Sequence, residues 1–169
     1  MVINRRVFVG ILLAATAPVA SAVVWWSRTD PAANPPMRIE VSLSDRTLSV
    51  IKHGEVVVKY DVAVGRPSHP TPTGRFYTGD IVWNPSWTPP PVKWAEGRTY
   101  EPPGARSNPM QGVKIYFRAP YYYIHGTNQP SSMGEAASHG CIRMIPDEAI
   151  SLAHLIDNAG GGVPMIIRE

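Results

Sequence analysis

The sequence predicts a mainly β domain, a sandwich or barrel, with one main helix near the C-terminus and one long proline-rich loop. Apolar and polar residues alternate over many short runs, which is the pattern of half-buried strands. The 18 prolines and 14 glycines indicate a chain rich in loops rather than a helical bundle. Only one segment, after residue 145, combines a helical apolar stripe with clear start and stop signals.

The first 22 residues predict an export signal. Arg5 and Arg6 precede an apolar core over residues 7–17, and Ala-Ser-Ala at residues 20–22 offers a cleavage site between small residues. The arginine pair also suits a twin-arginine signal, so both the Sec and the twin-arginine routes are open. The apolar run continues to Trp26, which leaves an uncleaved membrane anchor as the alternative. In both cases the rest of the chain is expected in the periplasm or the cell envelope.

The remaining chain divides into a linker and one domain. Residues 27–36 are polar and punctuated by proline, as in an extended linker, and residues 37–169 have the length of a single domain. The whole chain has 16 Lys and Arg and 13 Asp and Glu, so loss of Arg5 and Arg6 with the signal leaves a net charge of +1. This balance gives no reason to expect binding to nucleic acid.

The first half of the domain predicts an antiparallel meander. Its expected strands cover residues 39–43, 48–50, 56–64 and 76–83. His53-Gly54 can close a tight hairpin between the second and third of these strands. Residues 65–74 are rich in proline and glycine and are expected to form a loop.

Residues 84–112 are rich in proline, carry Trp87, Trp94 and Tyr100, and show little periodicity. A segment of this length without regular structure in a compact domain is usually a lid or a binding loop, or else it is disordered. The aromatic residues argue against disorder. We therefore expect an ordered functional loop.

The last part of the domain predicts short strands and the single helix. The expected strands cover residues 113–117, 121–124, 141–145 and 163–167. Pro146 suits the first turn of the helix, Asp147 and Glu148 complement its dipole, and three glycines at residues 160–162 end it.

Cys141 is the only cysteine and cannot form an internal disulfide. In an exported protein a lone thiol suggests reactivity, and a thiol becomes a nucleophile when an imidazole accepts its proton. His139 projects to the same face as Cys141 if the segment is extended. His125 ends a predicted strand, and a hairpin would bring it opposite Cys141. The residues alone do not choose between these two histidines.

Neighbouring residues fit acyl-transfer chemistry. Gly140 allows the amides near Cys141 to turn toward an oxyanion, and Gly126 exposes a carbonyl that can hold an imidazole N–H. Arg143 can receive a substrate carboxylate through its two-pronged guanidinium. Tyr123 belongs to an aromatic strand and is either a substrate contact or a packing residue.

Two structural interpretations stand beside the catalytic one. A cysteine in a strand is often only a small buried apolar residue. His125, His139 and Cys141 would also be a minimal zinc set, although no further cysteine and no metal-binding helix pattern accompany them, so no metal or cofactor is expected. His53 and His69 are expected to be solvated, and His154 to lie on the surface of the helix.

Two motifs together resemble the active-site signature of the YkuD-type L,D-transpeptidases. His-Gly-Thr stands at residues 125–127, and Ser-His-Gly-Cys-Ile-Arg-Met follows at residues 138–144. The resemblance extends over roughly residues 37–168 and includes Thr-Pro-Thr-Gly at residues 71–74 and Asn-Pro-Met at residues 108–110. It implies a mostly β, YkuD-like fold and a ping-pong acyl transfer on peptidoglycan stem peptides.

The resemblance also implies a role for each residue of the motifs. Cys141 would attack the carbonyl of the third residue of a tetrapeptide stem and expel the terminal D-alanine. His125 would be the general base, with its ring oriented by the carbonyl of Gly126, and His139 would support the thiolate or the oxyanion region. The backbone amides of Gly140 and Cys141 would form the oxyanion hole.

Contacts to the substrate are expected at Thr127, Ser138, Arg143, Tyr123, Trp87 and Trp94. The position of Arg143 holds asparagine in part of the family and arginine in another part. A thiolate nucleophile would also be acylated by carbapenems. The acyl acceptor stays open: a stem amine gives a 3→3 cross-link, a lipoprotein lysine gives an envelope tether, and water gives a carboxypeptidase or peptidase. A non-catalytic peptidoglycan-binding module and a structural zinc domain are the remaining alternatives.

Overall fold

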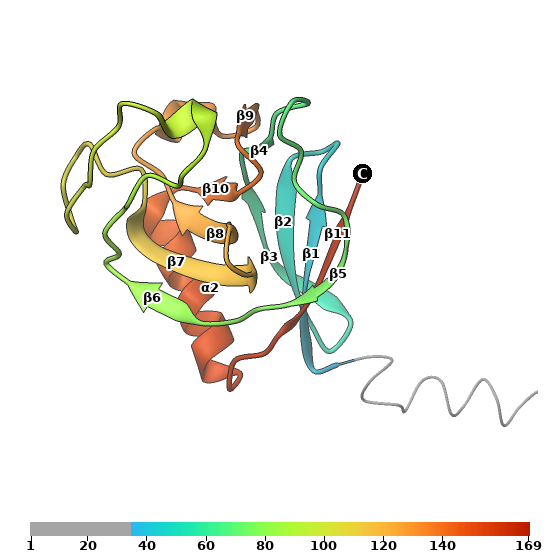
Figure 1. Ribbon diagram of the computed structural model, residues 1–169. Coiled ribbons are helices and arrows are strands. Elements are labelled where there is room, and N and C mark those ends of the chain that lie inside the picture. The colour runs from blue at the N-terminus through green and yellow to red at the C-terminus, as the bar shows by residue number, and fades with distance from the viewer. Residues whose placement is uncertain (1–34) are drawn as a thin grey trace, which may run out of the picture. The chain divides into compact units, whose positions relative to one another are not determined.

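The computed structural model describes residues 35–169, and the elements of this part are labelled in Figure 1. In chain order they are β1 (Met37–Ser42), β2 (Thr47–Lys52), β3 (Glu55–Asp61), β4 (Val64–Gly65), β5 (Gly74–Tyr77), β6 (Ile81–Trp83), the 3₁₀ turn η1 (Lys93–Ala95), β7 (Gln111–Arg118), β8 (Tyr122–Gly126), the 3₁₀ turn η2 (Pro130–Ser132), β9 (Ala136–Ser138), β10 (Ile142–Met144), α2 (Pro146–Asn158) and β11 (Pro164–Arg168). The expected signal or anchor, and the expected linker up to residue 34, lie outside the described residues. Within residues 35–169 no helix has the length and apolar character needed to cross a membrane.

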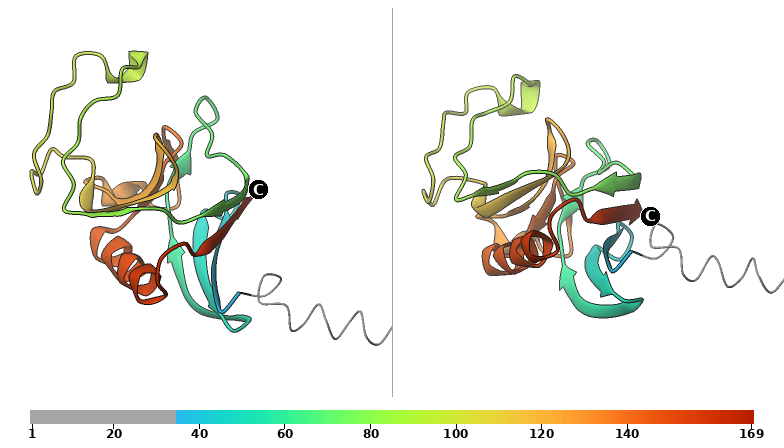
Figure 2. Two further views of the ribbon diagram at one scale, coloured as in Figure 1. Left: turned by 60° about the horizontal axis from the view of Figure 1, so that its bottom comes forward. Right: turned by 90° about the horizontal axis from the view of Figure 1, so that it is seen from below.

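The strands of residues 35–169 form two main sheets and one small one. The larger sheet has the order β3-β2-β1-β11-β5, the second has the order β10-β8-β7-β6, and β4 pairs with β9. The antiparallel meander of β1, β2 and β3 is confirmed, and the chain closes with β11 lying parallel to β1. Figures 1 and 2 show the two main sheets on either side of the core, with α2 against the smaller one.

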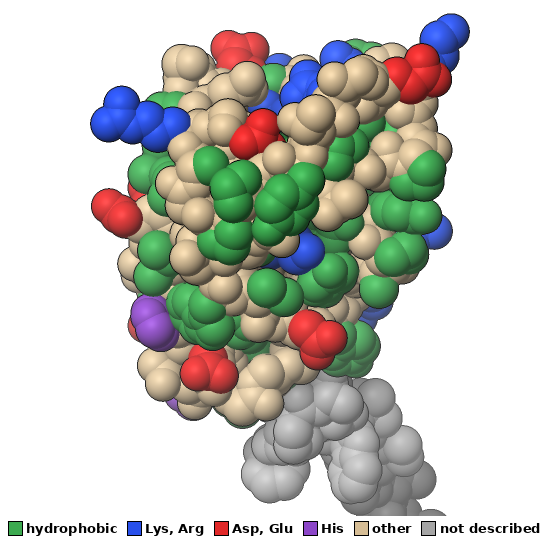
Figure 3. Space-filling model, turned by 60° about the vertical axis from the view of Figure 1, so that its left-hand side comes forward, with side chains coloured by type: hydrophobic (Ala, Val, Ile, Leu, Met, Phe, Trp, Pro, Cys, Tyr) green, Lys and Arg blue, Asp and Glu red, His purple; other side chains and the backbone are tan. Residues whose placement is uncertain are grey.

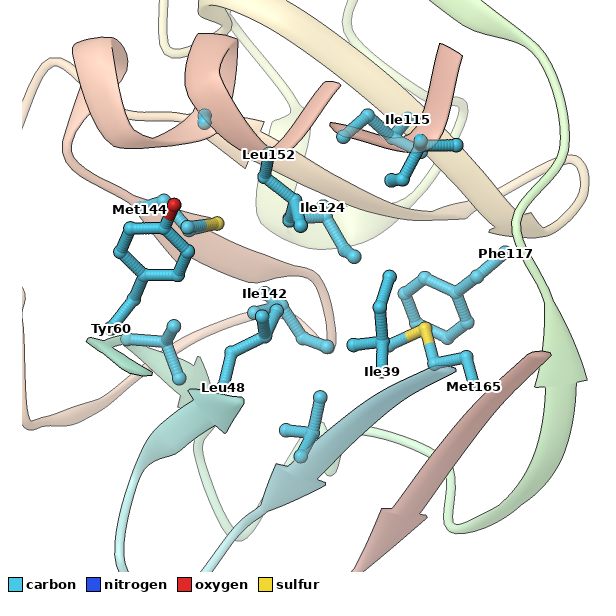
Figure 4. Packing of buried hydrophobic residues seen from close by; sticks show 14 of the residues in the cluster. Ile39, Leu48, Tyr60, Ile115, Phe117, Ile124, Ile142, Met144, Leu152 and Met165 are labelled. Carbon is cyan, nitrogen blue, oxygen red and sulfur yellow. The ribbon is translucent and has the colours of Figure 1, made fainter. Parts of the chain in front are cut away.

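Alternation along the strands builds the core. On β1 the side chains at odd positions, such as Ile39 and Val41, are fully buried, and on β7 Val113 and Ile115 are buried in the same way. Because successive side chains of a strand point to opposite faces, one face of each sheet is apolar and the two apolar faces meet. Figure 4 shows Ile39 and Ile115 among the buried residues of this core, together with Leu152 of α2. The predicted mainly β fold is therefore confirmed.

The expected single strand over residues 76–83 is instead two strands in different sheets. β5 pairs with β11 in the larger sheet and β6 pairs with β7 in the smaller one. Between them the Thr78 amide donates to the Val163 carbonyl at 2.9 Å, and the Gly79 amide donates to the Tyr116 carbonyl at 2.7 Å. The chain thus crosses from one sheet to the other while its backbone stays hydrogen-bonded, which an alternating pattern cannot reveal.

The expected hairpin between the strands of His125 and Cys141 is also wrong, because β8 and β10 are parallel. The chain leaves β8, passes through η2 and β9, and returns to begin β10 at the same end at which β8 begins. The strand at Cys141 is also shorter than expected, since β10 starts at Ile142.

The predicted helix is confirmed as α2. Pro146 occupies its first turn with two acidic residues, and the helix ends before the glycines at residues 160–162. Its buried face consists of Ala149, Leu152, Ala153 and Ile156. This face packs against β7 and β8, so α2 supports the sheet that carries the two motifs.

Replacing Leu152 by alanine should lower the free energy of unfolding by about 3 kcal/mol, because the fully buried leucine would leave a cavity between α2 and the sheets. Leu155 on the same helix is only partly buried, so Leu155→Ala is the matched control and should cost about 1 kcal/mol. Urea denaturation followed by circular dichroism would measure both. Equal losses for the two variants would contradict the assignment of Leu152 to the core.

Candidate active site

One face of the β10-β8-β7-β6 sheet is polar and carries the residues of both motifs. The parallel register sets Arg143 beside His125 and Ile142 beside Ile124. The two isoleucines are fully buried in the core, so their neighbours along each strand point to the opposite face. That polar face is made of Lys114, Tyr116, Tyr123, His125 and Arg143.

Cys141 comes immediately before β10 and lies on this same face. Continuing the register by two residues places it beside Tyr123 and diagonal to His125. The thiol of Cys141 donates to the carbonyl of Tyr121 at 3.5 Å and receives a hydrogen bond from the backbone of Tyr123. The crossover after β8 thus brings the cysteine beside the strand that carries His125.

A tight turn over residues 138–141 holds Cys141 in place. The Ser138 hydroxyl donates to the Cys141 carbonyl at 2.5 Å and accepts the Gly140 amide at 3.0 Å. Gly140 has φ +107°, and a Cβ there would lie 2.8 Å from the Tyr122 ring, so only glycine fits. Because the segment is bent, the expectation that an extended chain places His139 and Cys141 on one face is wrong.

The thiol of Cys141 is protonated at rest. Burial raises its pKa to about 11, against the opposing effects of the Tyr123 backbone hydrogen bond and of the Arg143 and Lys114 charges. These two cations and the backbone donor favour the thiolate, but the loss of hydration outweighs them.

His125 is a buried neutral base, with only 3% of its surface exposed. Its Nδ1–H donates to the Gly126 carbonyl at 2.9 Å, so Nε2 carries the free lone pair. Burial lowers the pKa of His125 to about 4, although the hydrogen bond to Gly126 works in the opposite direction. A Cβ at Gly126 would lie 2.2 Å from the Gln111 carbonyl oxygen, so the close approach of these strands requires glycine.

His139 lies in a different environment. Its Nε2 accepts a hydrogen bond from the Arg66 guanidinium, and its ring stacks on Trp94 at 4.0 Å between centroids. Burial, and secondly the Arg66 charge, lower the pKa of His139 to about 4. His69 was expected to be solvated, but it is half-buried with its ring 4.9 Å from that of His139, edge to face.

Two predicted substrate contacts are buried and bonded within turns. Thr127, 2% exposed, accepts the Gln129 amide at 3.1 Å, and Gln129 in turn accepts Arg143 Nη1 at 3.0 Å. Ser138 is 1% exposed and closes the turn before Cys141. Of the predicted set, the polar face brings together Cys141, His125, Arg143 and Tyr123.

The loop over residues 84–112 is ordered by one buried amide. Asn108 is fully buried and donates to the carbonyls of Pro85 at 2.8 Å and Pro102 at 3.0 Å, while its oxygen accepts the Met110 amide at 2.8 Å. Trp87 is buried at a backbone bridge to Glu101 and is therefore packed within the loop, whereas Trp94 extends to His139. Figure 3 shows the side of the molecule on which this loop lies, with apolar side chains gathered across its centre.

Residues 36–167 match the family model of the YkuD L,D-transpeptidase catalytic domain. The chain belongs to this family. The Bacillus subtilis protein YkuD is 32% identical over 123 residues, which cover 73% of this chain and 62% of YkuD, so the chain spans less than two thirds of that relative.

Solved structures share the fold of this domain. L,D-transpeptidase 3 from Mycobacterium tuberculosis superposes with a TM-score of 0.65 at 18% identity, covering 80% of this chain and 62% of the other. The L,D-transpeptidase LdtMt1, in complex with imipenem, superposes with a TM-score of 0.63 at 23% identity, covering 79% and 59%. These likenesses confirm the expected fold class.

The hollows on the surface of this domain do not by themselves mark the site. A hollow of about 400 Å³ lies beside His139 and is lined by His69, Val92, Lys93 and Trp94. A larger one, of about 540 Å³, is lined by Thr47, Lys59, Tyr60, Asp61, Pro130, Met133, Ile145 and Glu148, away from the neighbours of Cys141.

Within residues 35–169 no three His, Cys, Asp or Glu side chains gather in a way that could hold a metal ion.

Four residues near the site were not found from the sequence: Arg66, Asn108, Lys114 and Gln129. Asn108 stood in a noted motif, but its role as the anchor of the loop depends on contacts across the fold. Lys114 alternates with apolar residues on its strand, and this alternation is the one signal that could have placed it on the polar face. Arg66 and Gln129 lie in loops without any such pattern.

The alkylation rate of Cys141 by iodoacetamide should rise about tenfold per pH unit from pH 7 and level off only near pH 11, because the thiolate is the reacting form. Mass spectrometry of the intact protein at timed intervals would measure the rate. The control is the urea-denatured protein, whose plateau should begin near the ordinary cysteine pKa of about 8.5. A native plateau below pH 8 would contradict the buried, protonated thiol.

Proposed function

We propose that this domain is a peptidoglycan L,D-transpeptidase of the cell envelope, in which Cys141 forms an acyl-enzyme at the third residue of a tetrapeptide stem with release of D-alanine. One observation carries the proposal: a protonated thiol and a neutral imidazole with a free Nε2 share one face of the sheet. A base of this kind is what a protonated thiol needs to attack a carbonyl.

His125 is the general base in this mechanism. The pKa of the thiol lies near 11 and that of His125 near 4, so the resting pair is neutral rather than an ion pair. The proton therefore passes from Sγ to Nε2 as the carbon–sulfur bond forms, and the negative charge moves to the substrate oxygen. The imidazolium then returns this proton to the departing D-alanine amine.

His139 cannot play the same part, because its Nε2 already accepts a hydrogen bond from Arg66. Its ring is fixed between Trp94 and His69, so we assign it to the wall of the site. The Gly140 amide is bonded to the Ser138 hydroxyl, which leaves the Cys141 amide as the principal oxyanion donor.

The second half of the reaction transfers the acyl group to an acceptor. A side-chain amine of a second stem gives a 3→3 cross-link, and a lipoprotein lysine gives an envelope tether. Water in place of the amine gives an L,D-carboxypeptidase.

We further propose that residues 1–22 direct export and that residues 37–169 form the catalytic domain. Carbapenems would acylate Cys141, because their strained carbonyl resembles the carbonyl of the stem peptide.

The acyl-enzyme is tested by intact-mass spectrometry of residues 35–169 incubated with a disaccharide tetrapeptide and, separately, with imipenem. We expect an adduct on the wild type with each compound, with D-alanine released from the tetrapeptide, and none on Cys141→Ala. His125→Asn should lower the acylation rate by about 100-fold, because the asparagine cannot accept the proton. A wild type that forms no adduct with either compound would sink the proposal and favour a peptidoglycan-binding module.

The loop over residues 84–112 is proposed to cover the donor peptide, with Trp94 as part of its wall. Asn108→Ala should free this loop, raising KM for the tetrapeptide about tenfold through the loss of three buried hydrogen bonds. Asn158→Ala is the matched control, because Asn158 is exposed at the end of α2 and lies outside this loop. A KM that Asn108→Ala leaves unchanged, despite faster proteolysis of the loop, would refute the covering role.

A further inference from the structure

Four cations from four separate segments lie around the motif residues: the charges of Lys114 and Arg143 act on Cys141, and those of Arg66 and Arg98 act on His139 and Arg143. Lys114 and Arg143 stand on the polar face, with Lys114 Nζ 4.9 Å from the centroid of the Tyr116 ring. Arg66 follows β4, and its guanidinium donates to His139 Nε2. Arg98 belongs to the loop over residues 84–112.

Arg98 is brought to the site by the turn that carries Trp94. Its amide donates to the Ala95 carbonyl at 3.1 Å, which closes the chain behind η1. Trp94, within η1, stacks on His139. The Arg98 charge accordingly acts on both His139 and Arg143, and the Arg66 charge acts on the same two residues.

These cations have no acidic partner in the part of the chain that the structure describes. The ion pairs over residues 35–169 are those of Glu40 with Arg38 and with Arg168, both in the larger sheet. The side-chain partner of Arg143 is the neutral amide of Gln129, and that of Arg66 is His139. Like charges that lie close together without a counterion repel one another. An anion that binds between them reduces this repulsion and is attracted by each of the cations, so its binding is favourable.

We propose that Arg66, Arg98 and Arg143 form an anion-binding cluster that selects donor peptides with free carboxylates near the scissile bond over donors in which those groups are amidated. This inference rests on the proposed function and adds the chemical class of the donor. Arg98 is the specificity-determining member, because it alone is exposed and belongs to the covering loop. Its guanidinium can follow the donor as the loop closes over it.

The charge of the cluster can be measured without any enzyme activity. Iodoacetate and iodoacetamide alkylate the same thiolate, so the ratio of their rates cancels the pKa of Cys141 and reports the local potential. We expect the ratio in the native wild type to exceed that in the urea-denatured protein by at least about fivefold, and to fall about threefold in Arg98→Gln and in Arg66→Gln. Glutamine at position 66 keeps an N–H donor for His139.

The matched control is Arg75→Gln, which removes the same charge from an exposed position on β5 in the other main sheet. Its alkylation ratio should equal that of the wild type. A native ratio equal to the denatured one, or equal effects of Arg75→Gln and Arg98→Gln, would overturn the cationic cluster.

Selectivity is then measured with two tetrapeptide stems that differ only at the third residue, a diaminopimelate with a free side-chain carboxylate and its amide. We expect the wild type to acylate with a kcat/KM about tenfold higher for the free acid, and Arg98→Gln to reduce this preference to about threefold. Acylation by both stems at equal rates would overturn the inference and leave the proposed function intact. Acylation by neither stem would overturn the proposed function, while the alkylation ratio would still decide whether the cluster exists.

Discussion

The parallel pairing of β8 and β10 is the constraint on which the site depends. It sets Arg143 beside His125, and it buries Ile124 and Ile142 on the opposite face of the sheet. A slip of one residue would exchange these faces and send a charged side chain into the core. Hydrophobic packing against α2 therefore fixes the register, and the register in turn fixes where Cys141 stands. The geometry of the polar face is thus stabilised by the apolar face behind it.

Burial has opposite effects on the two groups that we propose to react, and both effects favour a neutral site. It raises the pKa of the Cys141 thiol and lowers that of the His125 imidazole. A resting ion pair would leave the thiolate open to oxidation and alkylation in an oxidising compartment. A neutral thiol is protected until a carbonyl arrives to take up the charge. Reactivity then depends on the presence of the substrate rather than on the pH of the surroundings.

Features that depend on local sequence patterns could be predicted from the sequence. Alternation predicted β1, β2 and β3, His53-Gly54 marked their hairpin, and Pro146 with the glycines at residues 160–162 bounded the helix. The pairing of β8 with β10 was missed because a parallel connection usually contains a helix, whereas this crossover uses η2 and the short β9. The family motifs named the two histidines, but only the contact of Arg66 with His139 distinguishes their environments. That contact joins residues 73 positions apart in the sequence.

The nucleophile and the charges around it are built on elements of different rigidity. Cys141, His125 and Arg143 stand on or beside paired strands, where a displacement would disturb the core. Arg98 stands on a loop that is held by hydrogen bonds of the Asn108 and Gln111 side chains and by the bridge between Trp87 and Glu101. A substitution at position 98 therefore changes the charge that acts on His139 and Arg143 without altering the strands beside Cys141. Under the proposal, a substitution in the loop would change the selection of the donor while the strands that carry Cys141 and His125 stay the same.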